Sequence, residues 1–228
     1  MKAKTLLIAA ATLAVGVISS QAQVYSQNIV GYVNTTALPN GQFVFVQNPV
    51  QNTTNDLYTL FPNVPTNTKI WEFVSGNWQA YTKRNTGLFS GYDNHEIKPG
   101  QGFFVQSAST DTVGFTNTFV GNVITGTNVL TYLTGGGFTP LANLAPVAGR
   151  IQTDLGLPAV NGDKIWTYDP VLGWETATRR TSSWSGAWYS GTNGVAGSGE
   201  PVIQVGQAFF IQSAATGSVG SWTNVFNP

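Results

Sequence analysis

Short stretches of alternating or continuous apolar residues dominate this chain. The segment 42–47 (QFVFVQ) is apolar on both faces and follows Asn40-Gly41, a dipeptide typical of tight turns, so it is expected to be a central strand. The only helix-like pieces are 56–61 and 150–157, and each is one or two turns long. The pattern therefore predicts strands joined by turns, with helix only as a connector.

The face on which each aromatic residue lies can be deduced from the alternation. In the segment that begins at Lys69, Trp71 and Phe73 share one face of a strand, whereas Ile70 and Glu72 share the other. The same register recurs 95 residues later, where an aromatic residue again follows two positions after a tryptophan. This agreement predicts that both tryptophans, Trp71 and Trp166, point into a core.

Five landmarks occur twice along the chain in the same order, which indicates an internal duplication. The paired segments are 30–33 with 120–123, 40–43 with 135–138, 69–71 with 164–166, 78–84 with 174–180, and 100–107 with 206–213. The spacing drifts slowly and then jumps by about ten residues, which places an insertion in the second copy between Arg180 and Gly206.

The predicted fold class is all-β: internally duplicated antiparallel β-sandwich or barrel-like units with one short helical turn per copy. Residues 1–22 are expected to form a signal peptide, residues 23–118 the first β repeat, and residues 119–228 the second β repeat with an insertion near 181–205.

The beginning of the chain has the order of a secretory signal. Lys2 and Lys4 precede an uncharged apolar run over 6–18, and Ser20 and Ala22 stand at the minus-three and minus-one positions of a cleavage site before Gln23. Thirteen apolar residues reach only about 20 Å as a helix, less than the roughly 30 Å hydrocarbon core of a membrane. We therefore expect cleavage and export, to the extracellular space, the cell surface or the periplasm.

Charge and cysteine content narrow the expected partners. Cleavage removes two of ten Lys and Arg residues and none of ten Asp and Glu, so the mature net charge is 8 minus 10, or −2. This balance gives no electrostatic reason to expect nucleic acid as a partner. No later stretch has the length of a transmembrane helix, and the chain has no cysteine for a disulfide. No cofactor is expected.

Several segments together resemble a known family. They are the segment 24–34 (VYSQNIVGYVN), Asn48-Pro49, the segment 61–65 (FPNVP) and the segment 99–104 (PGQGFF). With the signal peptide, the chain resembles a family of uncharacterised exported two-repeat β proteins common in verrucomicrobial bacteria. The resemblance implies a bacterial, secreted or envelope-associated protein, and it supplies no activity and no site residues.

Residues for catalysis or metal binding are sparse. The single histidine, His95, lies in the segment 93–96 (DNHE), which could suggest a metal site, but in an extended segment its ligands point to opposite sides and the second copy has no match. No Gly-x-Ser-x-Gly motif presents a nucleophilic serine, and sequence cannot pair the few carboxylates for glycoside cleavage. These observations predict a non-enzymatic protein without a metal.

Two features remain as candidate binding sites. The basic pair Lys83-Arg84 recurs as Arg179 and Arg180, which could bind carboxylates or sulfates of an acidic glycan or could be solvated strand ends. The insertion contains Trp188 and Tyr189, set among Ser, Gly and Asn residues that include Asn193, a composition suited to stacking contacts with adaptable hydrogen bonding.

Two functions follow from these observations. The first is a non-enzymatic exported structural or interaction protein of the cell surface or extracellular matrix. The alternative is a carbohydrate-binding module that uses the aromatic residues of the second-repeat insertion. The expected partners are polysaccharide or other surface proteins, and the discriminating observation is whether Trp188 and Tyr189 are exposed together.

Overall fold

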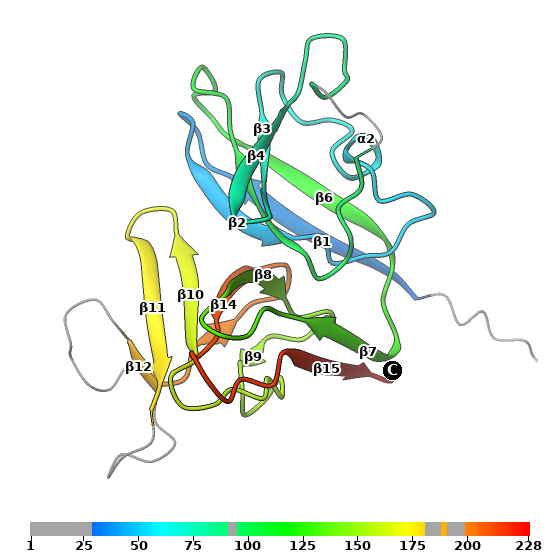
Figure 1. The fold of residues 1–228 in the computed structure, drawn as a ribbon. Helices are drawn as coiled ribbons and strands as arrows, with labels where there is room; N and C mark the ends of the chain where they lie inside the picture. The colour runs from blue at the N-terminus through cyan, green and yellow to red at the C-terminus, as the bar shows by residue number, and fades with distance from the viewer. Residues whose placement is uncertain (1–28, 91–94, 181–187, 191–198) are drawn as a thin grey trace, which may run out of the picture.

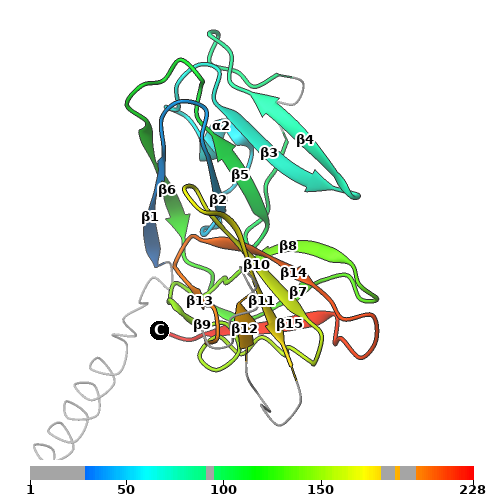
Figure 2. The same cartoon turned by 90° about the vertical axis from the view of Figure 1, so that its left-hand side faces the viewer.

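The computed structural model describes residues 29–90, 95–180, 188–190 and 199–228. Within this part of the chain the fold is all-β, as the alternation of apolar residues predicts, and its strands pair antiparallel in several sheets. In Figures 1 and 2, strands β1–β6 occupy one end of the molecule and strands β7–β15 the other; we call these two parts the first half and the second half. No helix among the described residues combines the length and apolar character needed to cross a membrane.

The first half contains a four-stranded sheet and a two-stranded ribbon. Its strands are β1 (Val30–Ala37), β2 (Phe43–Gln47), β3 (Lys69–Val74), β4 (Asn77–Thr82), β5 (Gly102–Gln106) and β6 (Phe115–Asn122). The sheet has the order β2-β5-β3-β4, and β1 pairs with β6 to form the ribbon.

The second half contains a five-stranded sheet and two ribbons. Its strands are β7 (Gly126–Thr131), β8 (Phe138–Ala142), β9 (Gly149–Arg150), β10 (Lys164–Asp169), β11 (Gly173–Arg179), β12 (Trp188–Ser190), β13 (Val202–Ile203), β14 (Ala208–Gln212) and β15 (Ser221–Phe226). The sheet has the order β12-β11-β10-β14-β8, and the ribbons are β9 with β13 and β7 with β15.

The two sheets arrange corresponding strands in the same order. The strands β8, β14, β10 and β11 follow one another as β2, β5, β3 and β4 do in the first sheet. One side-chain hydrogen bond also occurs in both: Trp71 Nε1 donates to Gln106 Oε1 at 2.9 Å, and Trp166 Nε1 donates to Gln212 Oε1 at 3.3 Å. The two sheets therefore have the same order of corresponding strands and the same Trp–Gln hydrogen bond. The duplication itself stays a prediction from the sequence.

Strand β6 runs across the expected repeat boundary at residues 118 and 119. All eight of its residues pair with β1, from Val30 opposite Asn122 to Ala37 opposite Phe115. The segments 30–33 and 120–123, which were matched as copies, therefore lie side by side in one ribbon. The first half accordingly ends after β6.

Of the two expected helical turns, one is a helix. Helix α2 (Leu57–Leu60) begins at Asp56, whose side chain accepts a hydrogen bond from the Thr59 N–H at 2.7 Å. Residues 151–155 instead form successive turns that end at Gly156, which has a φ of +73°. This left-handed residue stops the chain from continuing as a helix.

Each half has its own core on one face of its sheet, and the other faces of the two sheets meet. The first core includes Phe61, which makes edge contacts with Phe103 and Phe119, and the second core includes Phe209 against Trp222. A third cluster contains Phe45, Phe104, Ala142, Ala208 and Phe210 from both sheets. The arrangement is therefore sandwich-like, with the third cluster as its middle layer.

Candidate functional site

The tryptophan expected to stack on a ligand is buried. Trp188 is 3% exposed and belongs to the second core. It lies on β12, which pairs with the edge of β11 so that Trp188 stands opposite Arg179. Trp188 and Tyr189 are therefore not exposed together, and these two side chains do not form a shared aromatic platform.

The other candidate residues of this region are placed separately. Tyr189 is half-buried, and the guanidinium carbon of Arg180 lies 5.1 Å from the centre of its ring, a cation–π contact. Arg179 is also half-buried, and its Nη1 donates to the Arg180 carbonyl at 3.3 Å. Asn193 lies outside the described residues. The Arg180 guanidinium therefore packs against the Tyr189 ring of β12.

The first basic pair has a structural role. Lys83 is buried, and its Nζ donates to the carbonyls of Phe61 and Pro62 at 3.2 and 3.4 Å, just after the C-terminus of α2. Arg84 is exposed on the same strand end. Because Lys83 binds backbone carbonyls inside the protein, the two basic pairs do not form matching anion sites on the surface.

The structure instead gathers aromatic side chains between the two sheets. At the centre, the ring of Phe45 stacks on Phe104 with centroids 4.5 Å apart and on Phe210 with centroids 5.2 Å apart. These three rings come from β2, β5 and β14, and they belong to the residues that alternate away from the cores of the two halves. The faces of the sheets that do not cover a core therefore cover each other.

Two small residues allow the sheets to approach this closely. A Cβ atom added at Gly102 would lie 2.9 Å from the Cβ of Ala208 and 3.3 Å from the ring of Phe45. Ala208 is itself completely buried. Because side-chain volume is minimal where β5 meets β14, the larger rings on either side can reach across the gap.

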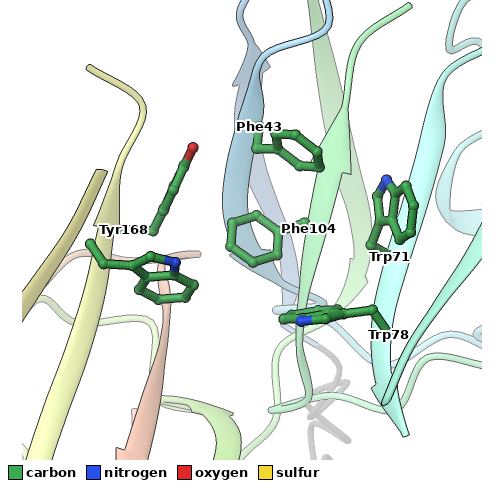
Figure 3. A pocket seen from close by; sticks show the side chains of 6 residues that line it. Phe43, Trp71, Trp78, Phe104 and Tyr168 are labelled. Carbon is green, nitrogen blue, oxygen red and sulfur yellow. The ribbon is translucent and has the colours of Figure 1, made fainter. Parts of the chain in front are cut away.

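The first pocket, of about 350 Å³, lies on one side of this contact and has an almost wholly apolar lining. Its lining residues are Phe43, Trp71, Trp78, Phe104, Tyr168 and Trp174. Figure 3 shows Tyr168 of the second sheet across the pocket from the residues of the first sheet. The pocket therefore depends on both halves of the molecule.

The second pocket, of about 250 Å³, repeats this arrangement from the other sheet. Its lining residues are Phe73, Trp78, Phe138, Trp166, Trp174 and Phe210. In the matching of the two repeats, Phe138, Trp166 and Phe210 are the counterparts of Phe43, Trp71 and Phe104. We call the two cavities the aromatic pockets.

Two tryptophans form a wall common to both aromatic pockets. Trp78 and Trp174 lie at matched positions of the β3–β4 and β10–β11 hairpins, and each is 40% exposed. Trp78 contacts Phe104 and Phe210 at centroid distances of 5.3 and 5.9 Å, and Trp174 contacts the same two rings at 5.7 Å each. These tryptophans are thus fixed by packing while part of each ring faces solvent.

Hydrogen bonds hold the ring of Trp71 in place. The Gln106 side chain accepts from the Trp71 indole through Oε1 and donates through Nε2 to the Gly41 carbonyl at 3.1 Å. The Lys69 ammonium lies 5.8 Å from the centre of the same indole. Because the indole N–H already has a partner, the ring offers a ligand mainly its apolar face, without reorganisation.

One position distinguishes the two aromatic pockets chemically. Tyr168 lines the first pocket, and its counterpart Phe73 lines the second. Among the described residues, no protein group is hydrogen-bonded to the Tyr168 hydroxyl. The first pocket therefore has a hydrogen-bonding group that the second lacks.

The single histidine belongs to a polar cluster around the buried Glu72 carboxylate. His95 Nε2 lies 2.5 Å from Glu72 Oε2, and its ring stacks on Tyr81 with centroids 4.5 Å apart. Tyr81 and Gln101 also donate hydrogen bonds to the Glu72 carboxylate. In the described part of the chain no three metal-binding side chains come together, and Asp93 and Asn94 of the expected metal segment lie outside that part.

The alternation of aromatic and other residues along the strands could have predicted the aromatic pockets. Trp71 and Trp166 were expected inside a core, but each is half-buried at the margin of the third cluster and lines a pocket. Trp78 and Trp174 served only as landmarks of the duplication. A search for aromatic residues repeated on the non-core face of both copies would have found all four.

Comparison of the chain with family models, with curated proteins and with solved structures finds no match in any of the three.

Proposed function

We propose that this protein is a non-enzymatic, exported binding protein of the cell surface or extracellular matrix, and that it recognises a polysaccharide through the two aromatic pockets. The observation that carries the proposal is a pair of adjacent pockets that share Trp78 and Trp174 and whose described lining residues are all aromatic. Pockets of this size with a largely apolar lining and few polar groups are typical ligand sites.

The chemistry of the lining supports a sugar as the ligand. A pyranose ring carries C–H groups on its faces and hydroxyls around its edge, so it stacks on an indole while its edge stays hydrated. Trp78 and Trp174 line both pockets and offer such ring faces, and each residue is 40% exposed. The Tyr168 hydroxyl supplies a group that can donate to or accept from a sugar hydroxyl.

The presence of two related pockets supports a polymer over a single sugar. Both pockets use the tryptophans of the β3–β4 and β10–β11 hairpins, so a ligand in one lies next to the other. A chain that repeats one chemical unit can occupy both, and the second contact then forms at a high effective concentration. We therefore expect affinity to rise steeply with the length of the oligosaccharide.

A glycan array followed by calorimetry tests this proposal. The wild-type mature protein is expected to bind at least one polysaccharide, and Trp78→Ala and Trp174→Ala are each expected to weaken binding about tenfold or more, because each residue serves both pockets. Tyr32→Ala is the matched control, since Tyr32 is 72% exposed and lines neither aromatic pocket. Absence of binding, or equal binding by all four proteins, overturns the proposal.

Export and surface location are tested separately. The proposal rests here on the signal-like segment at residues 1–22 and on the low charge of the rest of the chain. Cell fractionation with mass spectrometry of the mature N-terminus is expected to find a chain that begins at Gln23 in the surface or extracellular fraction. A full-length chain in the cytoplasm contradicts this part of the proposal.

A further inference from the structure

We infer that the second half contains a separate binding pocket for a small organic cation, at the place where the first half packs the imidazole of His95 against Glu72. This pocket lies on the core side of β10 and β11, the face opposite to the aromatic pockets. It therefore does not depend on the proposed recognition of a polysaccharide.

Backbone hydrogen bonds establish which residues correspond at this place. In the first half the Leu57 N–H donates to the His95 carbonyl at 3.1 Å, and in the second half the Ile151 N–H donates to the Pro201 carbonyl at 2.9 Å. Both Leu57 and Ile151 are completely buried. Pro201 therefore occupies the place of His95.

A second pair of hydrogen bonds fixes the neighbouring turn. The Lys98 N–H donates to Gln101 Oε1 at 3.2 Å, and the Gln204 N–H donates to Gln207 Oε1 at 2.9 Å. The side-chain amides of Gln101 and Gln207 thus accept equivalent hydrogen bonds from a backbone N–H three residues earlier. In the first half this geometry lets Gln101 Nε2 donate to the Glu72 carboxylate.

The strand registers complete the correspondence. Tyr81 stands opposite Ile70 on the β3–β4 hairpin, and on the β10–β11 hairpin Ala177 stands opposite Ile165. Likewise, Glu72 stands opposite Gln79, whereas Thr167 stands opposite Glu175. Three large side chains of the first half, Glu72, Tyr81 and His95, are therefore replaced by the smaller residues Thr167, Ala177 and Pro201.

A pocket of about 340 Å³ occupies the place of the missing side chains. Its lining is half polar, unlike that of the aromatic pockets. The lining residues are Ile165, Thr167, Glu175, Thr176, Ala177, Gly199, Glu200, Pro201, Val202 and Gln207. This volume lies within the roughly 300 to 1,000 Å³ common for small-molecule sites.

The charges of this lining favour a cation. Among the described residues that line the pocket, Glu175 and Glu200 are acidic and none is basic. The Glu200 carboxylate already accepts hydrogen bonds from the N–H groups of Gln152 and Thr153 and from the Thr153 hydroxyl. Glu175 is exposed and makes no ion pair with any described residue. Glu175 is therefore free to pair with a bound cation.

The His95 side chain of the first half indicates the chemistry of such a ligand. There, a carboxylate on the core face of the hairpin pairs with an imidazole that stacks on an aromatic ring. The second half also has a carboxylate on this face, that of Glu175 on the neighbouring strand β11, but it has no imidazole. A ligand with an N–H donor and an apolar body fits, because Ile165, Ala177 and Val202 provide apolar contacts. We assign the pocket to imidazolium or arylammonium compounds.

Calorimetric titration with benzylamine and 4-methylimidazole tests the assignment, with benzyl alcohol as the neutral counterpart of benzylamine. Wild-type protein is expected to bind both cations and to bind benzyl alcohol at least about tenfold more weakly. Glu175→Gln is expected to lower the affinity for both cations by about tenfold. Ala177→Tyr, which restores the residue of the first half, is expected to abolish binding.

Two further variants distinguish loss of this pocket from loss of the fold and from binding in the aromatic pockets. Val202→Lys places a positive charge at a lining position that is 51% exposed, so it is expected to leave the fold intact and to weaken cation binding even if Ala177→Tyr fails to fold. Trp78→Ala is expected to leave cation binding unchanged, because Trp78 is not among the described residues that line this pocket. The assignment is overturned if neither cation binds, if benzyl alcohol binds equally well, or if Trp78→Ala is the variant that removes binding.

Discussion

The two halves of the molecule use the same strands differently on their two faces. On the faces that meet each other, both sheets carry matched aromatic residues and form matched pockets. On the core faces they diverge, since Glu72, Tyr81 and His95 contact one another in the first half and the second half has a pocket at the corresponding place. The comparison shows that the two halves match on the faces where the sheets meet and differ on the faces that cover their cores.

The largest expected effect tests whether the two cores are equivalent. Phe103 and Phe209 occupy matched positions of β5 and β14, and both are completely buried. Replacing either by Ala leaves a large cavity, so each variant is expected to lose about 3–5 kcal/mol of unfolding free energy, measured by urea denaturation. A loss below about 1 kcal/mol in one variant alone contradicts the equivalence of the two cores.

The next effect concerns the place where the halves differ. His95→Ala removes the partner of Glu72, whose side chain is only 4% exposed, and leaves a buried carboxylate with fewer hydrogen bonds. We expect a loss of about 1–3 kcal/mol in the same denaturation experiment. Pro201→Ala at the matched position is the control and is expected to cost about 0.4–1 kcal/mol, through the unfolded state. Equal losses in both variants would show that the polar cluster contributes nothing particular to the first half.

A smaller effect distinguishes the two aromatic pockets. Tyr168→Phe removes the hydroxyl of the first pocket, and Phe73→Tyr introduces one at the matched position of the second. Polysaccharide affinity, measured by calorimetry, is expected to fall by about 0.5–1.5 kcal/mol for Tyr168→Phe. Phe73→Tyr is expected to preserve or raise the affinity. A fall in both variants would mean that ring packing, and not the hydroxyl, determines the difference.

The smallest effect concerns the turns that stand where the first half has α2. The side chain of Arg150 hydrogen-bonds the Asp154 carboxylate and lowers its pKa from 3.8 to about 2. Because the folded pKa lies below the unfolded one, the pair stabilises the fold fully above about pH 4, and this contribution is lost as the pH falls toward 2. Asp154→Asn is expected to lower the Tm slightly at pH 7.

The pH dependence of this variant provides its control. The difference in Tm between wild type and Asp154→Asn is expected to stay constant from pH 7 to about 5 and to shrink below about pH 4. Since the pair is solvent-exposed, the whole effect is small and is reduced by salt. A difference that grows as the pH falls contradicts the assigned direction.

The sequence predicted the fold class and the faces of the strands. Alternation in the segment that begins at Lys69 placed Ile70 and Glu72 on one face and Trp71 on the other, and the buried and half-buried positions of β3 follow that pattern. What covers each face was not predictable, because both faces of these strands are apolar. Only the tertiary structure shows that one face covers a local core and the other faces the second sheet.

The site residues were harder to predict for a related reason. The Ser- and Gly-rich surroundings of Trp188 are typical of a loop, yet pairing of β12 with β11 turns this side chain into the second core. Burial of Lys83 also depends on a distant segment, since its partners Phe61 and Pro62 directly follow α2. Contacts between residues far apart in sequence decided both outcomes.

The indole N–H signals of the seven tryptophans in a two-dimensional NMR spectrum test most directly whether the aromatic pockets bind a polysaccharide. On titration with a polysaccharide selected from the array, we expect the signals of Trp78 and Trp174 to shift. The signal of Trp222, which is completely buried in the second core, is expected to stay in place. Unchanged signals of Trp78 and Trp174 at saturating ligand would contradict binding at these pockets.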